Sequence, residues 1–285
     1  MEQHSIKLIE CPRDAMQGWK QMIPTEKKIA YINALLQVGF DTIDFGSFVS
    51  PKAIPQMADT KQVLAGLDLT GSKSKLLAII ANERGAEEAV LYNEISYLGF
   101  PLSVSETFQH RNTNSSIAES LKRVEAIQEL CIRNNKQLVV YLSMGFGNPY
   151  GDSWSEEIVF EKANQLANMG IEIISLADTV GLATADQVKR VTGHLIRNMP
   201  EVEIGVHLHS TAVNWREKLE AAYKVGCRRF DSALLGIGGC PMANDELVGN
   251  MDTTKVLSFF ENKESLHLNA EALQLSLHLA AEIFN

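Results

Sequence analysis

Several common sequence features are missing from this chain of 285 residues, and each absence excludes a class of protein. Its four cysteines form no Cys-x-x-Cys pair and no dense framework, so free thiols in a reducing compartment are expected rather than a disulfide-stabilised fold. No apolar stretch approaches the roughly 18–20 residues that a membrane-spanning helix needs. The first residues also lack the basic and apolar regions of a signal peptide. We therefore expect a soluble, cytoplasmic protein.

An excess of positive charge is also missing. Lysine and arginine total 26 against 35 acidic residues, which gives a net charge of −9. This balance argues against non-specific binding to nucleic acid or to a membrane surface, but an anionic substrate remains compatible because only the local field of a pocket acts on it. The hydrophobic content of 45% and charged content of 21% are ordinary for a globular enzyme with a full core.

Eight short β-rich runs alternate with helical patterns from one end of the chain to the other. The expected strands are 6–10, 42–45, 75–81, 95–99, 138–143, 172–177, 202–208 and 229–234. Eight strand–helix units in about 250 residues are the number that closes a (β/α)8 barrel. The alternative is a doubly wound open sheet, but a Rossmann sheet requires a Gly-x-Gly-x-x-Gly turn after its first strand. Here Cys-Pro-Arg-Asp follows that strand, so we predict the barrel.

Helix signals extend beyond the barrel. Capping boxes begin two helices, at Ser116-x-x-Glu119 and Thr184-x-x-Gln187. Asn269 is a plausible N-cap for a final helix over about 266–285, after a barrel over about 5–260. No linker rich in proline, glycine or serine divides the chain, so residues 1–285 are predicted to form a single domain.

The run Val206-His-Leu-His209 ends an apolar strand with two imidazoles. Residues two apart in an extended strand point to the same side, so His207 and His209 would form half of a metal site. Taken alone, the motif is as often structural or on the surface as it is ligating. Two other segments, one near each end of the chain, offer the missing ligands.

In such barrels the reacting groups lie at the carboxyl ends of the strands. The unusual polar residues of this sequence fall at those positions. They are Arg13 and Asp14 after the first strand, Asp44 and Ser47 after the second, Asn82 after the third, Ser143 at the end of the fifth, Asp178 and Thr179 after the sixth, His207 and His209 at the end of the seventh, and Cys240 and Asn250 after the eighth.

Barrel closure makes the first and eighth strands neighbours. Asp14, the two histidines and Asn250 could therefore converge although 236 positions separate the first from the last. One carboxylate, two imidazoles and one amide oxygen suit an octahedral ion such as Mg²⁺ or Mn²⁺, with two positions open. Zinc is less favoured, because it usually takes a thiolate or a tighter tetrahedral set.

Some of these residues also have simpler explanations. Asp14 could pair only with Arg13 or cap a turn, and Asp178 could cap the next helix. Cys240 could be a small buried hydrophobe, as lone cysteines commonly are. Gly238 and Gly239 nevertheless mark a flexible loop, in which a thiol would be reachable.

Taken together, these segments resemble the 3-hydroxy-3-methylglutaryl-CoA lyases, which are metal-dependent barrels that break C–C bonds next to a thioester. The matching segments are Pro12-Arg-Asp-Ala-Met-Gln17, Ser47-Phe-Val-Ser-Pro-Lys52, Pro55-Gln-Met57, Ser115-Ser-Ile-Ala-Glu-Ser120, Ser175-Leu-Ala-Asp-Thr179, the two histidines and Gly238-Gly-Cys-Pro241. The resemblance covers about residues 6–254. Ser-Phe-Val-Ser-Pro-Lys and Gly-Gly-Cys-Pro are specific to the lyase branch, whereas Arg-Asp and His-x-His also occur in condensing synthases.

The resemblance implies a role for each site residue. The metal ligands would be Asp14, His207, His209 and Asn250, and the catalytic residues would be Arg13, which stabilises an enolate oxygen, Cys240, which transfers a proton, and His207. The acyl pocket would be lined by Gln17, Asp44, Ser47, Asp178 and Thr179. The CoA portion would be faced by Lys20 and by Ser116, the latter because a helix N-terminus attracts anions. The implied reaction is Mg²⁺- or Mn²⁺-dependent cleavage of 3-hydroxy-3-methylglutaryl-CoA (HMG-CoA) to acetyl-CoA and acetoacetate, as in leucine degradation. A homodimer or homotetramer is expected.

The chain departs from the family pattern at three places, all of which bear on acyl specificity. Cys11 replaces the usual glycine, Asp44 replaces the usual glutamate, and the loop that contains 242–248 is one residue longer. One alternative is therefore a related lyase or acyltransferase that acts on another 3-hydroxyacyl-CoA or a 2-keto acid. A second alternative is a non-catalytic barrel that binds an acyl-CoA, although every expected ligand type is present.

Overall fold

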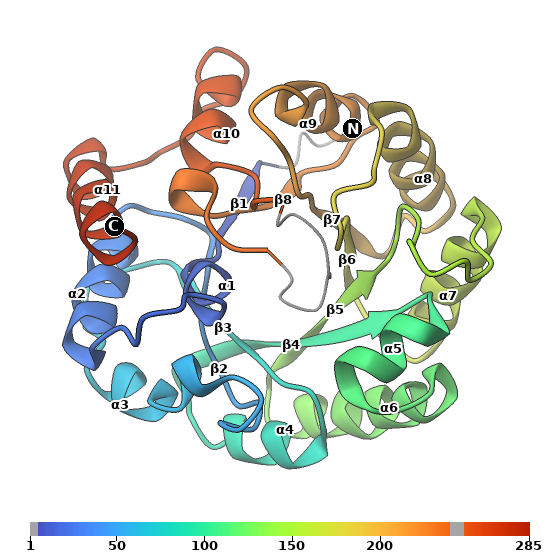
Figure 1. The fold of residues 1–285 in the computed structure, drawn as a ribbon, viewed down its shortest axis with the longest axis horizontal. Helices are drawn as coiled ribbons and strands as arrows, with labels where there is room; N and C mark the ends of the chain where they lie inside the picture. Colours follow the sequence, from blue (N-terminus) through green and yellow to red (C-terminus); the bar gives the residue numbers. More distant parts are fainter. Residues whose placement is uncertain (1–4, 240–247) are drawn as a thin grey trace.

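The computed structural model describes residues 5–239 and 248–285, and its sheet is a closed barrel (Figure 1). The eight strands are parallel and follow one another around the ring in sequence order, so that β8 pairs with β1. They are β1 (Lys7–Glu10), β2 (Thr42–Ser47), β3 (Lys75–Ile79), β4 (Ile95–Ser103), β5 (Gln137–Ser143), β6 (Ile173–Ala177), β7 (Glu203–His207) and β8 (Arg229–Ser232). The predicted (β/α)8 barrel and all eight expected strands are confirmed.

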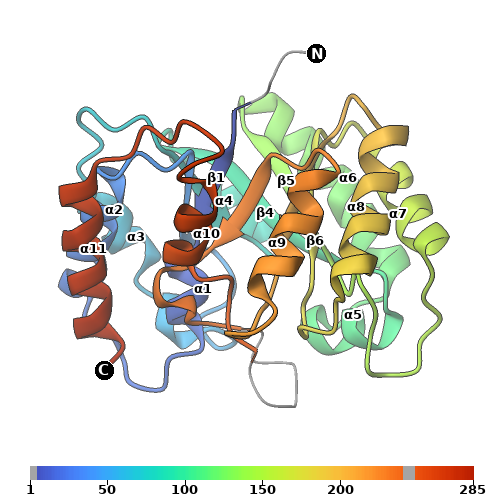
Figure 2. The same ribbon diagram turned by 90° about the horizontal axis from the view of Figure 1, so that it is seen from above.

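A ring of helices covers the outside of the barrel. Its members are α2 (Thr25–Leu36), α3 (Thr60–Ala65), α4 (Glu83–Ala89), α6 (Ile117–Arg133), α7 (Glu156–Asn168), α8 (Ala185–Asn198), α9 (Trp215–Lys224) and α10 (Thr253–Phe260). Two short helices, α1 (Pro12–Gln17) and α5 (Glu106–Thr113), lie at the end of the barrel opposite the start of β1 (Figure 2). Two 3₁₀ turns, η1 (Pro55–Met57) and η2 (Leu234–Gly236), complete the loops at this end. Within the described ranges, no helix has the length and apolar character to cross a membrane.

The main difference from the expected strands concerns β4, which continues to Ser103 instead of ending at residue 99. Proline has no N–H to donate to a neighbouring strand, so the backbone nitrogen of Pro101 must point to a side where no strand is paired. Gly99 faces β3, where its carbonyl accepts the amide of Ile80, and Pro101 faces the same way but lies beyond the end of β3. Its missing N–H therefore removes no ladder bond, and β4 stays paired with β5 as far as Ser103.

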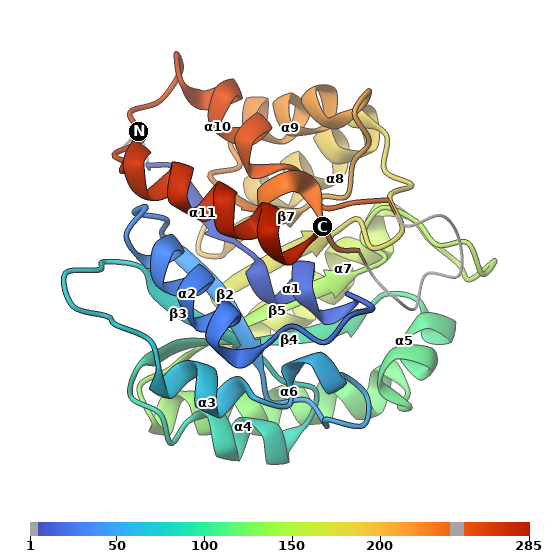
Figure 3. The ribbon, with the colours of Figure 1, turned by 60° about the vertical axis from the view of Figure 1, so that its left-hand side comes forward.

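The helix-start signals of the sequence are confirmed. The Ser116 hydroxyl accepts the Glu119 amide while the Glu119 carboxylate accepts the Ser116 amide, and Thr184 forms the same box. Asn269 caps α11 (Ala270–Ile283), and its own amide donates to the carbonyl of Val38 at 2.8 Å. Figure 3 shows the result: the last helix lies along α2, outside the ring.

The barrel interior is apolar on one side and polar on the other. Inward-facing side chains of β3 to β6 form one apolar cluster, made of Leu77, Ile79, Tyr97, Val139, Tyr141 and Ile173. On β7 and β8, Gly205 is in register with Arg229, and His207 with Asp231. The charged side chains of Arg229 and Asp231 are buried, which is unusual in a barrel core and marks the side on which the site lies.

Candidate functional site

The ligand atoms of Asp14, His207 and His209 all lie within 4.8 Å of one another, although they come from opposite ends of the sequence. Asp14 is in α1, directly after β1, while His207 ends β7. The side-chain amide of Asn250 donates to Asp14 Oδ2 at 2.7 Å, so the fourth predicted ligand is in the same group. The convergence expected from barrel closure is therefore present.

Backbone pairing places Asn250 beside the histidines. Ser210 donates to the carbonyl of Gly249 at 2.9 Å, and Met251 donates to that of Leu208 at 3.2 Å. His209 and Asn250 thus face each other in a short antiparallel bridge. This pairing could not be read from a strand pattern, because it involves only a few residues beyond the ends of the barrel strands.

Gly238 allows two backbone segments to approach this group. Its φ of +104° suits glycine, and a Cβ at this position would lie 2.5 Å from Asn250 Nδ2 and 2.9 Å from the carbonyl oxygen of Asp14. Any other residue would collide with the Asn250 side-chain amide and with the backbone of Asp14. The close packing and the donor set of carboxylate, two imidazoles and amide fit a hard divalent cation.

Arg13 is held rigidly beside this group. Its Nε and Nη2 donate to the Asp44 carboxylate, and its Nη1 donates to Asp14 Oδ1 and to Gln17 Oε1, both at 2.9 Å. Burial would lower the pKa of Arg13, but the two carboxylates raise it above its ordinary value. One Nη2 hydrogen has no acceptor among the described residues, so a permanently charged donor is available to a bound molecule.

The two carboxylates that contact Arg13 differ in acidity. Burial raises the pKa of Asp44 to about 6, although Arg13 opposes the rise. Burial would also raise the pKa of Asp14, but Arg13, His207 and the hydrogen bond from Asn250 hold it below its ordinary value. Asp14 is therefore anionic at neutral pH, as a cation ligand must be.

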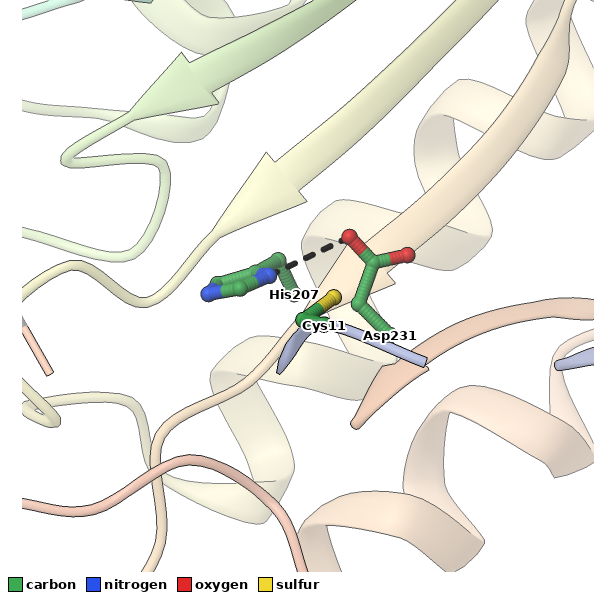
Figure 4. A group of neighbouring side chains, drawn as sticks. All are labelled: Cys11, His207 and Asp231. Atoms are coloured by element: carbon green, nitrogen blue, oxygen red, sulfur yellow. Dashed lines mark hydrogen bonds and ion pairs between the residues drawn. The ribbon is translucent and has the colours of Figure 1, made fainter. Parts of the chain in front are cut away.

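The two imidazoles also differ. Burial and the neighbouring His207 lower the pKa of His209 to about 3, so its ring is neutral and has a free lone pair. Burial would lower the pKa of His207 too, but a hydrogen bond between its Nδ1 and Asp231 Oδ2, at 3.1 Å, raises it instead (Figure 4). Sequence reasoning missed Asp231, although a carboxylate inside the last strand was a usable signal.

Three predicted pocket residues lie close to the strand ends. Gln17 donates to Asp14 Oδ1 at 2.8 Å and thus lies in the site itself. Ser47 is buried, and its hydroxyl accepts the amide of Val49 at 3.1 Å. Thr179 is also buried and accepts the amide of Met144 at 2.9 Å. Ser47 and Thr179 therefore fix loop backbone at the mouth of the barrel.

Asp178 is committed to a buried ion pair. Its Oδ2 lies 2.8 Å from the ammonium of Lys218 in α9, and its Oδ1 accepts the amide of Ala183 at 3.0 Å. Lys218 is fully buried and also donates to the carbonyl of His209 at 2.9 Å. Sequence reasoning missed Lys218 because it lies among other charged residues at the start of a helix. The simpler explanation of Asp178 as the cap of the next helix is wrong, because Thr184 caps that helix and the Ala183 amide precedes the cap.

The two residues expected to face CoA are less well placed. Lys20 is exposed. Ser116 is only partly buried, and its hydroxyl and its backbone amide both donate to the Glu119 carboxylate. The next amide, that of Ile117, donates to the Glu106 carboxylate at 3.2 Å. Two carboxylates occupy the helix N-terminus that an anion would need, which argues against Ser116 as a phosphate contact. Cys240 lies outside the described residues.

Known proteins are similar to this chain in both sequence and fold. The HMGL-like family model matches residues 6–278, a range that includes every candidate site residue. This chain belongs to the HMGL-like family. Its members include carbon–carbon lyases, and 3-hydroxy-3-methylglutaryl-CoA lyase of Rattus norvegicus (cytoplasmic) is 34% identical to this chain over 88% of it and 73% of the relative.

Bacterial members are equally similar. A 3-hydroxy-3-isohexenylglutaryl-CoA/hydroxymethylglutaryl-CoA lyase of Pseudomonas aeruginosa is 33% identical over 91% of this chain and 86% of its own length. An HMG-CoA lyase from Acinetobacter baumannii, solved with coenzyme A and 3-methylmalate, superposes with a TM-score of 0.90 at 36% identity, over 98% of this chain and 91% of that one. The family expected from the sequence motifs is confirmed.

Proposed function

We propose that this HMGL-like protein is a divalent-cation-dependent lyase that cleaves HMG-CoA to acetyl-CoA and acetoacetate. The proposal is supported by relatives of that name at 33–36% identity. The observation that carries it is the meeting of Asp14, His207 and His209 within 4.8 Å, next to the partly unsatisfied guanidinium of Arg13. Such a site can stabilise negative charge on neighbouring oxygens of one substrate.

The four ligands Asp14, His207, His209 and Asn250 would hold the cation, which we propose to be Mg²⁺ or Mn²⁺. When bound, a cation of this kind would lower the pKa of a coordinated hydroxyl. His209 and Asp14 can act as ligands without first losing a proton, because one is neutral and the other anionic at neutral pH. Gly238 leaves the space that the Asn250 amide occupies beside the backbone of Asp14.

Arg13 would bind the thioester oxygen. Cleavage of the C–C bond leaves an enolate, whose negative charge falls on that oxygen. A guanidinium already fixed by Asp44 and Gln17 can stabilise this charge without reorganising during the reaction. An acid must then protonate the enolate carbon. Cys240 is our candidate for this step, and its role is a prediction because it lies outside the described residues.

The acyl group is the least determined part of the proposal. The Pseudomonas aeruginosa relative is named for a longer isohexenyl substrate as well as for HMG-CoA. Asp44 replaces the glutamate usual in the family and contacts Arg13 directly, so the acyl pocket differs at this position. A role in leucine degradation, a cytoplasmic location and a homodimeric or homotetrameric state remain predictions.

Product analysis tests the proposal directly. Purified protein is incubated with HMG-CoA or 3-hydroxy-3-isohexenylglutaryl-CoA, with Mg²⁺ or with a chelator, and acetyl-CoA is quantified. We expect cation-dependent release of acetyl-CoA, which His209→Ala abolishes together with Mn²⁺ binding. The matched control is His278→Ala, which changes an exposed histidine on α11. Full activity after chelation, or in the His209 variant, would refute the proposal.

A further inference from the structure

Two groups of potential ligands share His207. One is Asp14, His207 and His209, and the other is Cys11, His207 and Asp231; within each group the ligand atoms lie within 4.8 Å of one another. Figure 4 shows the second group, in which one ring nitrogen of His207 faces Asp231 and the other points away. A neutral imidazole has one lone pair. His207 can therefore be a ligand on one of its two sides at a time.

The side that faces Asp231 is occupied by a hydrogen bond. Nδ1 of His207 lies 3.1 Å from Asp231 Oδ2, and the Asp231 side chain is 0% exposed. The two residues are in register on β7 and β8, so the strand pairing itself holds them together. An ionised carboxylate only accepts hydrogen bonds, so Nδ1 carries the proton and Nε2 keeps the lone pair.

Arg229 places a positive charge on the same inner side of the barrel. It precedes Asp231 by two residues on β8, so both side chains point inward. Its Nε and Nη2 and the Oδ1 of Asp231 are buried without a partner among the described residues. Gly205, opposite Arg229 on β7, makes the space: a Cβ there would lie 2.9 Å from Arg229 Cδ. The positive charge of Arg229 disfavours a cation beside Asp231.

We propose that Asp231 is a positioning residue for the cation site: it accepts the Nδ1–H of His207, which fixes the ring and leaves Nε2 as the ligand beside Asp14 and His209. This inference rests on the proposed function, because it assumes that the site binds a cation. Carboxylates that orient a ligating histidine typically change metal affinity by about 10–100-fold when they are removed. Nothing in the sequence motifs singles out Asp231.

The first test is the tautomer of His207 without any cation. In ¹⁵N-labelled protein, long-range NMR correlations distinguish an Nδ1–H from an Nε2–H imidazole. We expect the Nδ1–H form in the wild type and in Glu10→Gln, a matched change of another buried carboxylate that instead bonds Thr253 and the Leu234 amide. Asp231→Ala should shift the ring toward Nε2–H. An unchanged tautomer would overturn the inference, whatever the enzyme catalyses.

The second test is Mn²⁺ affinity, measured by titration calorimetry on the same proteins. Asp231→Ala should weaken binding by about 10–100-fold. Asp231→Asn keeps an acceptor for Nδ1–H and should lose less, and Glu10→Gln should match the wild type. Asp231→Asn also keeps the test valid if the alanine variant does not fold. Equal affinity in both Asp231 variants and the wild type would refute the role of Asp231, whereas a wild type that binds no Mn²⁺ would instead refute the proposed function.

Cobalt distinguishes the two sides of His207. If Co²⁺ binds beside Asp14 and His209, its spectrum should lack a thiolate-to-cobalt band. A band that disappears in Cys11→Ser would place the ion between Cys11, Nδ1 of His207 and Asp231, and this result would overturn the inference.

Discussion

Replacing Lys218 with methionine should destabilise the barrel and weaken cation binding at the same time. The Lys218 ammonium is fully buried and lies 2.8 Å from Asp178 Oδ2, 2.9 Å from the carbonyl of His209 and 3.3 Å from that of Gly181. An ammonium has three hydrogens, so these contacts use all of them. Lys218 thus joins the loop after β6 to the backbone of a predicted ligand.

The expected magnitude follows from the burial of both charges. The side chains of Lys218 and Asp178 are 1% and 2% exposed, so solvent screens the pair little. Removing one partner of such a pair typically costs about 3–5 kcal/mol, since the other charge stays buried. Methionine replaces the four-atom stem of lysine and lacks only the position of the ammonium, so little of the loss comes from a cavity. The free energy of unfolding of a whole domain is only about 5–15 kcal/mol.

A double-mutant cycle separates the interaction energy of Lys218 with Asp178 from the other effects of each substitution on stability. Asp178→Asn keeps an acceptor for the Ala183 amide, and the double variant should be less destabilised than the sum of the single variants by about 1–3 kcal/mol. Urea unfolding, followed by tryptophan fluorescence and circular dichroism, measures these values.

The matched control is Lys28→Met. Lys28 is also a buried lysine, and it pairs with Asp59 at 2.7 Å. The Lys28→Met substitution should lower the free energy of unfolding but leave Mn²⁺ affinity unchanged, whereas Lys218→Met should lower both. A loss below about 1 kcal/mol for Lys218→Met, or additive single variants, would refute the reasoning about this pair.

Two further predictions test the surroundings of the site. Burial raises the pKa of Glu10 to about 8, against 4.5 for the ordinary group, so the folded protein keeps a proton that the unfolded chain releases. The stability of the wild type relative to Glu10→Gln should therefore fall between about pH 4.5 and 8, by up to about 1.4 kcal/mol per pH unit. Parallel urea-midpoint curves for the two proteins would contradict this. Gly238→Ala should reduce Mn²⁺ affinity and turnover together, because its Cβ would lie 2.5 Å from Asn250 Nδ2 and its φ is positive. A crystal structure with Asn250 and Asp14 still in contact, and unchanged affinity, would contradict this second prediction.

Local sequence patterns were sufficient for the framework of the fold. The eight strands, the two capping boxes and the Asn269 cap depend on residues close together in the chain, and all were predicted correctly. The extension of β4 was missed because Pro101 is acceptable only where β3 has already ended, and that depends on a neighbouring strand.

The gathering of Asp14 with the two histidines was predictable for a topological reason. Once eight strands close, β1 and β8 are adjacent, which brings Asp14 close to His207 at the end of β7. Asn250 reaches this group through its short bridge to His209, beyond the ends of the strands. Strand alternation alone placed His207 and His209 on one side. The sequence therefore determined which residues gather at the end of the barrel.

The partners of the buried charges were decided only by the tertiary structure. Asp231 beneath His207 and Lys218 beneath His209 belong to no sequence motif, and their neighbours in the chain do not indicate which residues they contact. Periodicity tells which side of an element a residue faces, but the energy of a buried charge depends on what faces it from other elements. That information exists only after the strands have closed and the outer helices have packed against them.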